Sequence, residues 1–380
     1  MTDFTDISKK LSSSLSKDTR KKEGIFFTPK NVRTKIIQVI DTRNIQPQRI
    51  LEPSCGSGEF LNDVKKYNAN ITAIEFNKKI YDEIKTHYSD MEVLNMDFME
   101  YKNEEKFDLI IGNPPYFVTT QKNKKCMSGR GNIFVLFIYK CLTEHLSEGG
   151  MLAFVLPTSF YNCKYYEPCR RYIYENTKIV HLENVEAKYI DTTQSTMIMC
   201  IQNKRSKSRP YFLDFSDNLC LSPAYRQIKS LIKEATTLKE LGCHVKTGEV
   251  VWNEHKDKLN DNNGVPVLYS SNIINNNLVL DNLSGEKKQY IQDYHKKPTK
   301  GPAILISRGY GNNYIFSYTF IEEGFEFYGE NHINVITGDK KVLKRVLDSL
   351  ADDRTSEFIK LYTGNGSLSK TEIENILPIF

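Results

Sequence analysis

The sequence predicts an α/β protein in which a wound, mostly parallel sheet is followed by a smaller, mainly β domain. Up to about Asn203, short apolar runs typical of buried strands alternate with helical patterns. Beyond that point the chain is rich in Asn, Gly and Tyr, with short β-branched runs and one helical stretch. A chain of 380 residues is long enough for two such domains.

The composition is that of a soluble, intracellular protein, for which we expect a cytoplasmic location. Charged residues make up 26% of the chain and hydrophobic residues 39%. The chain has neither an apolar run of about eighteen residues nor a secretory leader pattern at its polar start. Its eight cysteines include no Cys-x-x-Cys pair, so we expect reduced thiols and no structural metal. We also expect a monomer without membrane contact.

The first elements in chain order are a polar lead-in and a helix. Residues 1–22 are rich in Ser, Thr and Lys and are expected to be mobile or weakly helical. Residues 26–29 have the pattern of a turn that opens a helix, with Thr28 as the N-cap and Pro29 at the first helical position. The free N–H groups of such a helix end can hold a carboxylate.

A short strand at residues 49–51 runs directly into a glycine loop. The loop contains Glu52, Ser54, Gly56 and Gly58. Its two glycines let a ligand approach the backbone closely, although a lone Gly-x-Gly is a weak signal.

The next two predicted strands also end in acidic residues. The strand that begins at Ile71 ends in Glu75, a carboxylate that can accept both hydroxyls of a ribose, and Phe76 beside it can cover an adenine face. A third strand, residues 92–95, leads to Asp97, which could accept from an adenine amino group. Together with the glycine loop these residues describe an adenosine site. No Gly-x-x-x-x-Gly-Lys loop is present, so a nucleoside triphosphate is not indicated.

The fourth predicted strand, residues 109–111, leads into Gly-Asn-Pro-Pro-Tyr, at the strand end where open α/β sheets place their chemistry. Two adjacent prolines fix two φ angles and remove two N–H donors, so the Asn113 side chain and the Pro114 carbonyl can act as acceptors directed at one point. The ring of Tyr116 stands beside them. Such a site suits a planar group with an NH₂, such as an adenine amino group or a glutamine amide. The alternative is an ordinary Asn-Pro turn.

The remaining elements complete the sheet and the second domain. Their order implies a right-handed wound parallel sheet with a late antiparallel edge. We expect a helix at residues 132–146; strands at 150–157, 178–185 and 197–201; a helix at 225–235; strands at 265–270, 303–307 and 314–320; and a helix at 342–350.

The net charge of +5 is unevenly distributed. The first 235 residues carry 35 Lys and Arg against 28 Asp and Glu, whereas from Thr236 onward the counts are 17 and 19. Three basic runs in the first part indicate a polyanionic substrate, although such runs also occur as solvated loops. The runs contain Lys17, Arg20, Lys21 and Lys22; Lys122, Lys124, Lys125 and Arg130; and Lys204, Arg205, Lys207 and Arg209.

Taken in order, these motifs resemble the Taq-type (γ-class) DNA adenine-N6 methyltransferases over about residues 24–203. The resemblance implies a Rossmann-like S-adenosylmethionine methyltransferase domain with a mixed, mostly parallel seven-stranded sheet, and a smaller α+β target-recognition domain. The matching pieces are Phe27-Thr28-Pro29 for the N-terminal cofactor motif, Leu51 to Gly58 for the glycine loop, Glu75 and Asp97-Phe98 for the acidic strand ends, and Asn113 to Tyr116 for the catalytic motif.

The resemblance also implies the chemistry: S-adenosylmethionine as cofactor, double-stranded DNA as partner and N6-methyladenine as product. It suggests a restriction-modification system, with a separate cognate restriction endonuclease as a further partner. The implied catalytic residues are Asn113, Pro114 and Tyr116. The implied cofactor residues are Thr28, Pro29, Glu52, Ser54, Gly56, Gly58, Glu75, Phe76, Asp97, Phe98 and Asn113.

DNA contacts are implied in both halves of the chain. Tyr189 matches the ring that stacks on the far face of a flipped adenine, although here Ile190 follows it where the family has Pro. An exposed loop tyrosine is the alternative. The C-terminal part resembles, more loosely, target-recognition domains of Taq-type enzymes and of type I specificity subunits. The candidate DNA-contacting residues are Tyr116, Tyr189, Lys122, Lys124, Lys125, Arg130, Lys287, Lys288 and Arg308, with Asn312 as a further polar position.

We therefore expect a lead-in at 1–22, a catalytic domain at 23–205, a linker and helix at 206–235, and a target-recognition domain at 236–380. A release-factor glutamine methyltransferase or an RNA N-methyltransferase remains an alternative, because the NH₂ of a glutamine amide can be held by the same two acceptors as the amino group of adenine. Glutamine methyltransferases carry their recognition helices in front, however, whereas here 145 residues follow the linker. An alternative of another class is a DNA specificity subunit whose methylation site has decayed.

Overall fold

The computed structural model describes residues 4–186, 189, 195–215, 218–283, 285–308, 316–362 and 368–380. The chain forms two compact units. Unit 1 comprises Met1–Asp214 and Asn218–Tyr225, and unit 2 comprises Phe215–Asp217 and Arg226–Phe380. The boundary falls inside the stretch 206–235, for which a linker was expected.

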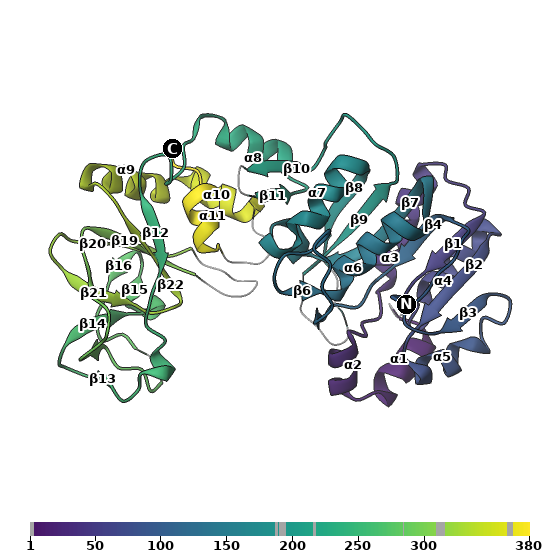
Figure 1. Ribbon diagram of the computed structural model, residues 1–380, viewed down its shortest axis with the longest axis horizontal. Coiled ribbons are helices and arrows are strands. Elements are labelled where there is room, and N and C mark those ends of the chain that lie inside the picture. Colours follow the sequence, from purple (N-terminus) through teal and green to yellow (C-terminus); the bar gives the residue numbers. More distant parts are fainter. Residues whose placement is uncertain are drawn as a thin grey trace. The chain divides into compact units, whose positions relative to one another are not determined.

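Unit 1 is built on a seven-stranded sheet of order β3-β2-β1-β4-β7-β9-β8 (Figure 1). Five strands pair in parallel, and β9 runs antiparallel to both of its neighbours. The mixed, mostly parallel Rossmann-like sheet is thus confirmed. The strands are β1 Arg49–Glu52, β2 Asn70–Glu75, β3 Glu92–Asn95, β4 Phe107–Gly112, β7 Leu146–Pro157, β8 Lys178–Val185 and β9 Thr196–Gln202.

The expectation of an antiparallel edge was wrong in its placement. The antiparallel strand β9 lies inside the sheet between β7 and β8, and β8 forms the edge. Strand β9 turns back directly from β8 and pairs with β7 along seven residue positions, Met151 to Pro157. Pairing on both sides buries the apolar residues of β9, which a solvent-exposed edge would leave open.

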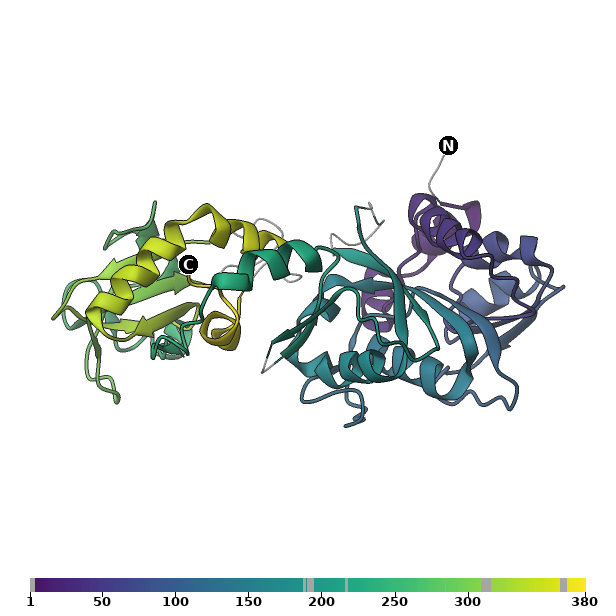
Figure 2. The ribbon, with the colours of Figure 1, turned by 90° about the horizontal axis from the view of Figure 1, so that it is seen from above.

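Helices cover both faces of the sheet (Figure 2). Neighbouring residues of a strand point to opposite faces, so Ile50 packs with the first helices while Leu51 packs with the later ones. The first group is α1 Asp6–Ser14, α3 Lys30–Thr42, α4 Glu59–Val64 and α5 Lys78–Lys85; the later group is α6 Ile133–Lys140 and α7 Glu167–Asn176. Shorter pieces in unit 1 are the strand pairs β5 Val118–Thr119 with β6 Gly131–Asn132 and β10 Phe212–Phe215 with β11 Asn218–Leu221.

The expected polar lead-in is folded onto unit 1. Two capped helices, α1 and α2 (Lys17–Glu23), occupy most of it. Leu11 and Leu15 are buried in the core, and the buried hydroxyl of Ser8 donates to Ser57 in the glycine loop at 2.8 Å. Two leucines four residues apart supply the apolar face that anchors an otherwise polar segment.

Two predicted helix boundaries shift. Helix α3 begins at Lys30 with Pro29 as its N-cap, so Thr28 is not the cap. The Thr28 hydroxyl is instead engaged as an acceptor for the Asn113 side chain. The helix predicted at 132–146 is α6 followed by a π-helical turn, Cys141–His145, after which β7 begins.

Unit 2 is an α+β unit with a four-stranded sheet, a five-stranded sheet and a small hairpin. The four-stranded sheet consists, in spatial order, of β12 His244–Thr247, β22 Ile333–Thr337, β19 Ala303–Ser307 and β20 Tyr318–Ile321. The five-stranded sheet consists of β13 Leu259–Asn260, β17 Tyr290–Ile291, β14 Val265–Leu268, β21 Glu326–Gly329 and β18 Thr299–Lys300. The hairpin is formed by β15 Ile273–Ile274 and β16 Asn277–Leu278. The helices are α8 Tyr225–Leu231, α9 Lys340–Ala351, α10 Asp353–Tyr362 and α11 Lys370–Asn375. The predicted strands and helices of this region are present with shifted bounds. The strand predicted at 314–320 is β20, which begins at Tyr318, and residues 314 and 315 lie outside the described residues.

Within the described residues, none of the helices has the length and apolar character needed to cross a bilayer.

Candidate functional site

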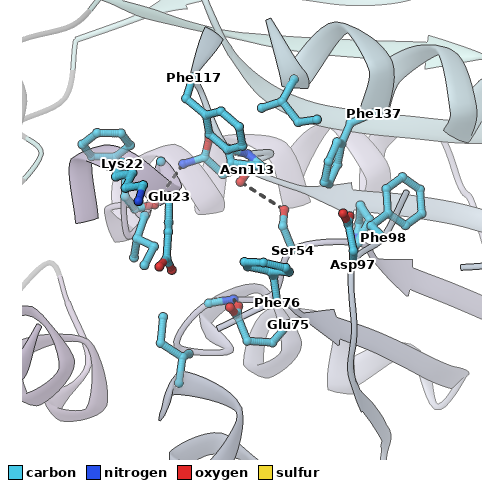
Figure 3. Close-up of a pocket in the computed structure, with 18 of the residues that line it drawn as sticks. Lys22, Glu23, Ser54, Glu75, Phe76, Asp97, Phe98, Asn113, Phe117 and Phe137 are labelled. Atoms are coloured by element: carbon cyan, nitrogen blue, oxygen red, sulfur yellow. Dashed lines mark hydrogen bonds between the residues drawn. The ribbon is translucent and has the colours of Figure 1, made fainter. Parts of the chain in front are cut away.

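A cavity of ≈ 530 Å³ lies in unit 1 at the carboxyl ends of β1, β2, β3 and β4 (Figure 3). The strand order reverses between β1 and β4, which is the switch point where open α/β sheets bind ligands. The volume is typical of a small-molecule site, about 300–1,000 Å³. The predicted cofactor residues on its wall are Ser54, Gly56, Glu75, Phe76, Asp97, Phe98 and Asn113.

Glu75 is held in place by two backbone N–H groups. Its carboxylate accepts from Gly56 N at 2.8 Å and from Asn77 N at 2.7 Å, one bond to each oxygen. Burial raises the pKa of Glu75 to about 7, although the backbone hydrogen bonds oppose this shift. Each oxygen keeps acceptor capacity, so the group can still receive a pair of hydroxyls.

One end of the cavity is suited to a flat apolar ring with an amino group. The Phe76 ring is 65% exposed, which is unusual for a large aromatic side chain. In Figure 3, Asp97, Phe98 and Phe137 gather at one end of the cavity, and Lys22 and Glu23 lie at the other. Phe98 packs against Phe137 with ring centroids 4.7 Å apart.

Two predicted cofactor residues of the glycine loop lie behind the cavity wall. Gly58 has φ +75°, and a Cβ there would come within 2.3 Å of the Tyr88 ring, so this glycine permits close packing. Glu52 is 2% exposed, and its Oε2 has no hydrogen-bond partner among the described residues. Burial raises the pKa of the Glu52 carboxyl well above its usual value. An unpartnered buried carboxyl beside the cavity is what a site for a cationic ligand would provide.

The Asn113 side chain has a defined orientation. Its Nδ2 donates to the Phe26 carbonyl at 3.2 Å and to Thr28 Oγ1 at 3.1 Å, while its Oδ1 accepts from the Tyr116 hydroxyl. The Phe26 carbonyl can only accept, so it decides which end of the amide is the NH₂ and which is the oxygen. Ser54 Oγ also donates to the Asn113 backbone carbonyl, at 3.3 Å. Asn113 therefore presents a carbonyl oxygen as an acceptor at the cavity wall.

Tyr116 lies beside Asn113 in an aromatic cluster. Its ring centroid is 6.5 Å from that of Phe26 and 5.9 Å from that of Phe134. Its hydroxyl also donates to the Val155 carbonyl, at 2.8 Å. Pro114 and Tyr116 do not line the cavity, whereas their neighbours Pro115 and Phe117 do.

Tyr189 is buried, with 9% of its surface exposed. Its hydroxyl shares a hydrogen bond of 2.9 Å with Thr196 Oγ1. It lies close enough to Tyr116 to raise the pKa of that phenol, after the larger effect of burial. The alternative of an exposed loop tyrosine is therefore wrong. Most of the loop around it, residues 187, 188 and 190–194, lies outside the described residues.

The predicted DNA-contacting cations differ in their exposure and in their contacts within the protein. Those of the loop between β5 and β6 are exposed: Lys122, Lys124, Lys125 and Arg130. In unit 2, the Lys287 ammonium lies 5.1 Å from the centre of the Tyr269 ring, and Arg308 donates to the Asn331 carbonyl at 3.1 Å. Lys288 is exposed, and Asn312 lies outside the described residues. Lys287 and Arg308 thus have structural contacts within their own unit.

The sequence reasoning missed the connection between α2 and α3 as part of the cavity wall. Residues 22–27 all line it, and Glu23 accepts from Asn77 Nδ2 at 2.7 Å. The available signal was the spacing of Leu11 and Leu15, which indicates a helix that packs on the domain.

Comparison with known proteins points to one family. Residues 7–190 match the family model described as Eco57I restriction-modification methylase. The chain is 32% identical over 389 residues to the type II methyltransferase M.CvrRI of Paramecium bursaria Chlorella virus XZ-6E, and 31% identical over 390 residues to the modification methylase CviBIII of Paramecium bursaria Chlorella virus NC1A. Both alignments cover 99% of each chain. Among solved structures, the N-methyltransferase NodS from Bradyrhizobium japonicum WM9, in complex with S-adenosyl-L-homocysteine, is 13% identical with a TM-score of 0.35, covering 53% of this chain and 100% of that one.

Proposed function

The chain belongs to the type II restriction-modification methyltransferases, and we propose that, within this family, it methylates N6 of an adenine in a short sequence of duplex DNA. As a member it is a site-specific DNA methyltransferase, and its cofactor is S-adenosylmethionine. The order of its motifs supports a place in the Taq-type branch. The observation that carries the proposal is the orientation of the Asn113 amide, with its oxygen available as an acceptor.

The cavity fits the cofactor. Glu75 would accept the ribose hydroxyls, and Phe76 and Asp97 would meet the adenine ring and its amino group. The unpartnered Glu52 carboxyl suits the cationic part of the molecule. When bound, S-adenosylmethionine supplies an electrophilic methyl group on a sulfonium. Glu75, Phe76 and Asp97 come from the ends of adjacent strands, so one ligand in the cavity can touch them together.

Asn113 and Pro114 would activate the target amine. An exocyclic amino group is neutral and loses its proton after attack, so the step requires position rather than a strong base. Acceptors for both N–H bonds, Asn113 Oδ1 and the Pro114 carbonyl, would draw the nitrogen lone pair out of conjugation with the ring. Alignment and preorganised polar groups of this kind can supply several kcal/mol of the barrier.

The target base must leave the duplex stack before it can reach these acceptors, which costs a few kcal/mol. Stacking on the Tyr116 ring would offset roughly 1–3 kcal/mol of this. Tyr189 is close to Tyr116 and is the candidate for the opposite face, which requires its ring to become accessible when DNA binds. We further expect the enzyme to act as a monomer and to protect sites cut by a separate cognate endonuclease.

The experiment is nucleoside analysis of methylated DNA together with an Asn113→Ala variant. The parent enzyme should produce N6-methyladenine, and Asn113→Ala should produce no detectable product. Calorimetry should show that the variant still binds S-adenosylmethionine, because Gly56 and Glu75 are unchanged. N4-methylcytosine or a methylated RNA or protein as product would overturn the assignment, as would an Asn113→Ala variant that works within a few fold of the parent.

A further inference from the structure

Thr28 does not line the cavity, although the resemblance implies that it binds the cofactor. It is 4% exposed, and its hydroxyl faces Asn113, whose Nδ2 donates to Thr28 Oγ1 at 3.1 Å. The second acceptor for the same Nδ2 is the Phe26 carbonyl at 3.2 Å. Both acceptors belong to the turn before α3, 85 or more residues away along the chain.

The amide of Asn113 can act in only one of its two orientations. With Oδ1 toward the substrate, it accepts from an amino group. Turned by 180°, it would present an NH₂ to that amino group, and two donors would face one another. The energy that separates the two orientations comes from the partners of Nδ2 and Oδ1. The Phe26 carbonyl can only accept, so it favours the orientation with Nδ2 toward it. The Tyr116 and Thr28 hydroxyls can each donate or accept, and the Thr28 hydroxyl adds the second contact that holds Nδ2 in place.

Thr28 is itself rigidly placed. The Arg33 guanidinium donates to the Thr28 carbonyl at 3.0 Å. Arg33 is 6% exposed and forms ion pairs with Glu59, which is also buried, and with Asp63 at 2.7 Å. Glu59 and Asp63 belong to α4, the helix that starts directly after the glycine loop. Arg33 therefore connects Thr28, whose hydroxyl contacts Asn113, to α4, the helix that follows the glycine loop of the cofactor cavity.

We propose that Thr28 is a positioning residue for the reaction, which, together with the Phe26 carbonyl, holds the Asn113 amide in place through its hydroxyl rather than by touching the cofactor. This role rests on the proposed function, because it presupposes that Asn113 Oδ1 accepts the amino group of the target base. It concerns a residue type as well as a position: any replacement at 28 must keep a hydroxyl.

The test compares Thr28→Val with Thr28→Ser. Valine has nearly the same shape and lacks the acceptor, whereas serine keeps it. We expect the single-turnover rate of methyl transfer in Thr28→Val to fall roughly 5- to 30-fold, the loss that corresponds to one hydrogen bond left partly unsatisfied. The dissociation constants for S-adenosylmethionine and for DNA should stay within about twofold, and Thr28→Ser should recover most of the rate.

A matched control separates this role from the general loss of a buried hydroxyl. Thr177 is 1% exposed, and its hydroxyl donates to the Ile173 carbonyl at 2.8 Å without contact to Asn113. Thr177→Val should lower thermal stability about as much as Thr28→Val does and leave the rate unchanged. Should Thr28→Val fail to fold, Thr28→Ala carries the same expectation without the branched side chain.

Three results would overturn the inference. One is a parent-like transfer rate in Thr28→Val while Asn113→Ala is inactive, which would leave the proposed function standing. Another is a loss that appears wholly in cofactor affinity, which would return Thr28 to the cofactor site. The last is an equal loss of rate in Thr177→Val. An active Asn113→Ala variant would instead remove the proposed function itself.

Discussion

At the scale of single residues, the candidate site depends on side chains whose orientation is set by distant backbone groups. Glu75 is held by the amides of Gly56 and Asn77, and Asn113 by the turn that ends at Thr28. Neither side chain is free to choose its rotamer when a ligand arrives. Preorganisation of this kind reduces the ordering that binding would otherwise require.

The raised pKa of Glu75 predicts a pH-dependent stability in the absence of cofactor. Its pKa is about 7 in the folded protein, above the ordinary value of 4.5, so folding favours the protonated form. The associated stability is fully present below pH 4.5 and is lost as the pH rises through 7. A shift of this size corresponds to roughly 3 kcal/mol. Thermal unfolding should therefore show Glu75→Gln gaining stability relative to the parent between about pH 5 and pH 8.

Because the glutamine variant has one acceptor fewer at every pH, only the change in the stability difference with pH is diagnostic. A difference between parent and variant that is the same at about pH 5 and pH 8 would mean that Glu75 is ionised throughout.

The second prediction at this scale concerns Tyr116. Tyr116→Phe keeps the ring and removes the hydroxyl that contacts Asn113 and Val155, so transfer should fall less than about tenfold. Tyr116→Ala removes the stacking surface and should cost a further factor of roughly 5 to 150, the equivalent of roughly 1–3 kcal/mol. Single-turnover rates and the fluorescence of a 2-aminopurine at the target position would measure both.

Tyr189→Ala is the comparison for the opposite face of the base. If it matches the parent in both assays, the second stacking ring is another residue, with Phe160 and Tyr161 as the next candidates. Both of these are buried in the structure, and the Tyr161 hydroxyl donates to Asn184 Oδ1 at 2.6 Å.

At the scale of elements, the end of α2 is packed directly on the Asn-Pro-Pro-Tyr loop, residues 113–116. Gly24 caps this helix with φ +66°, and a Cβ there would lie 2.8 Å from Tyr116 N and 3.0 Å from Pro115 Cβ. Lys22 and Glu23, just before it, line the cavity. One short helix end therefore touches both the cavity and the Asn-Pro-Pro-Tyr loop.

We predict that Gly24→Ala separates these two elements and lowers transfer at least tenfold, with weaker cofactor binding. Gly149→Ala is the control, because Gly149 has φ +76° and a Cβ there meets nothing within 4 Å. Both variants should lose about 1–2 kcal/mol of stability from the left-handed backbone conformation. Equal activity of the two variants would show that the Gly24 contact has no role in the site.

At the scale of the whole molecule, we expect the attraction of DNA phosphates and the recognition of the DNA base sequence to depend on different units. Phosphate attraction is independent of sequence and depends on salt, whereas base edges are read by polar side chains in the grooves. The exposed cations Lys122, Lys124 and Lys125 lie in unit 1. The nearly neutral unit 2 contains the candidate reading residues Lys287, Lys288 and Arg308.

Changing Lys122, Lys124 and Lys125 together to Ala should weaken binding to all duplex DNA. The slope of log K against log salt should become shallower by about one for each phosphate that the variant no longer neutralises. Lys288→Ala is the comparison, since it should alter which sites are methylated while it changes the total affinity little. Binding assays over a salt series and sequencing of methylated sites would distinguish the two. If substitutions throughout unit 2 left the choice of methylated sites unchanged, the residues that recognise the DNA sequence would lie outside unit 2.

Local sequence patterns were sufficient to predict the strands around the cavity and seven of the residues on its wall. The apolar runs at residues 49–51, 71–75 and 109–111 are local signals, and each became a strand within one or two residues of its predicted bounds. Parallel strands present their carboxyl ends at one edge, so residues placed after those strands must meet there. That is why Ser54, Gly56, Glu75, Asp97 and Asn113 could be grouped without knowledge of any contact.

Roles that depend on partners far along the chain are set by tertiary packing. The meeting of Thr28 with Asn113, the burial of Glu52 and Tyr189, and the packing of α1 and α2 follow from how the sheet and helices close on one another. Local patterns cannot contain such information, because a hydroxyl or a carboxyl has the same propensity whether its partner is water or a residue 85 positions away. The place of β9 inside the sheet has the same origin, since it depends on pairing with β7 as well as with β8.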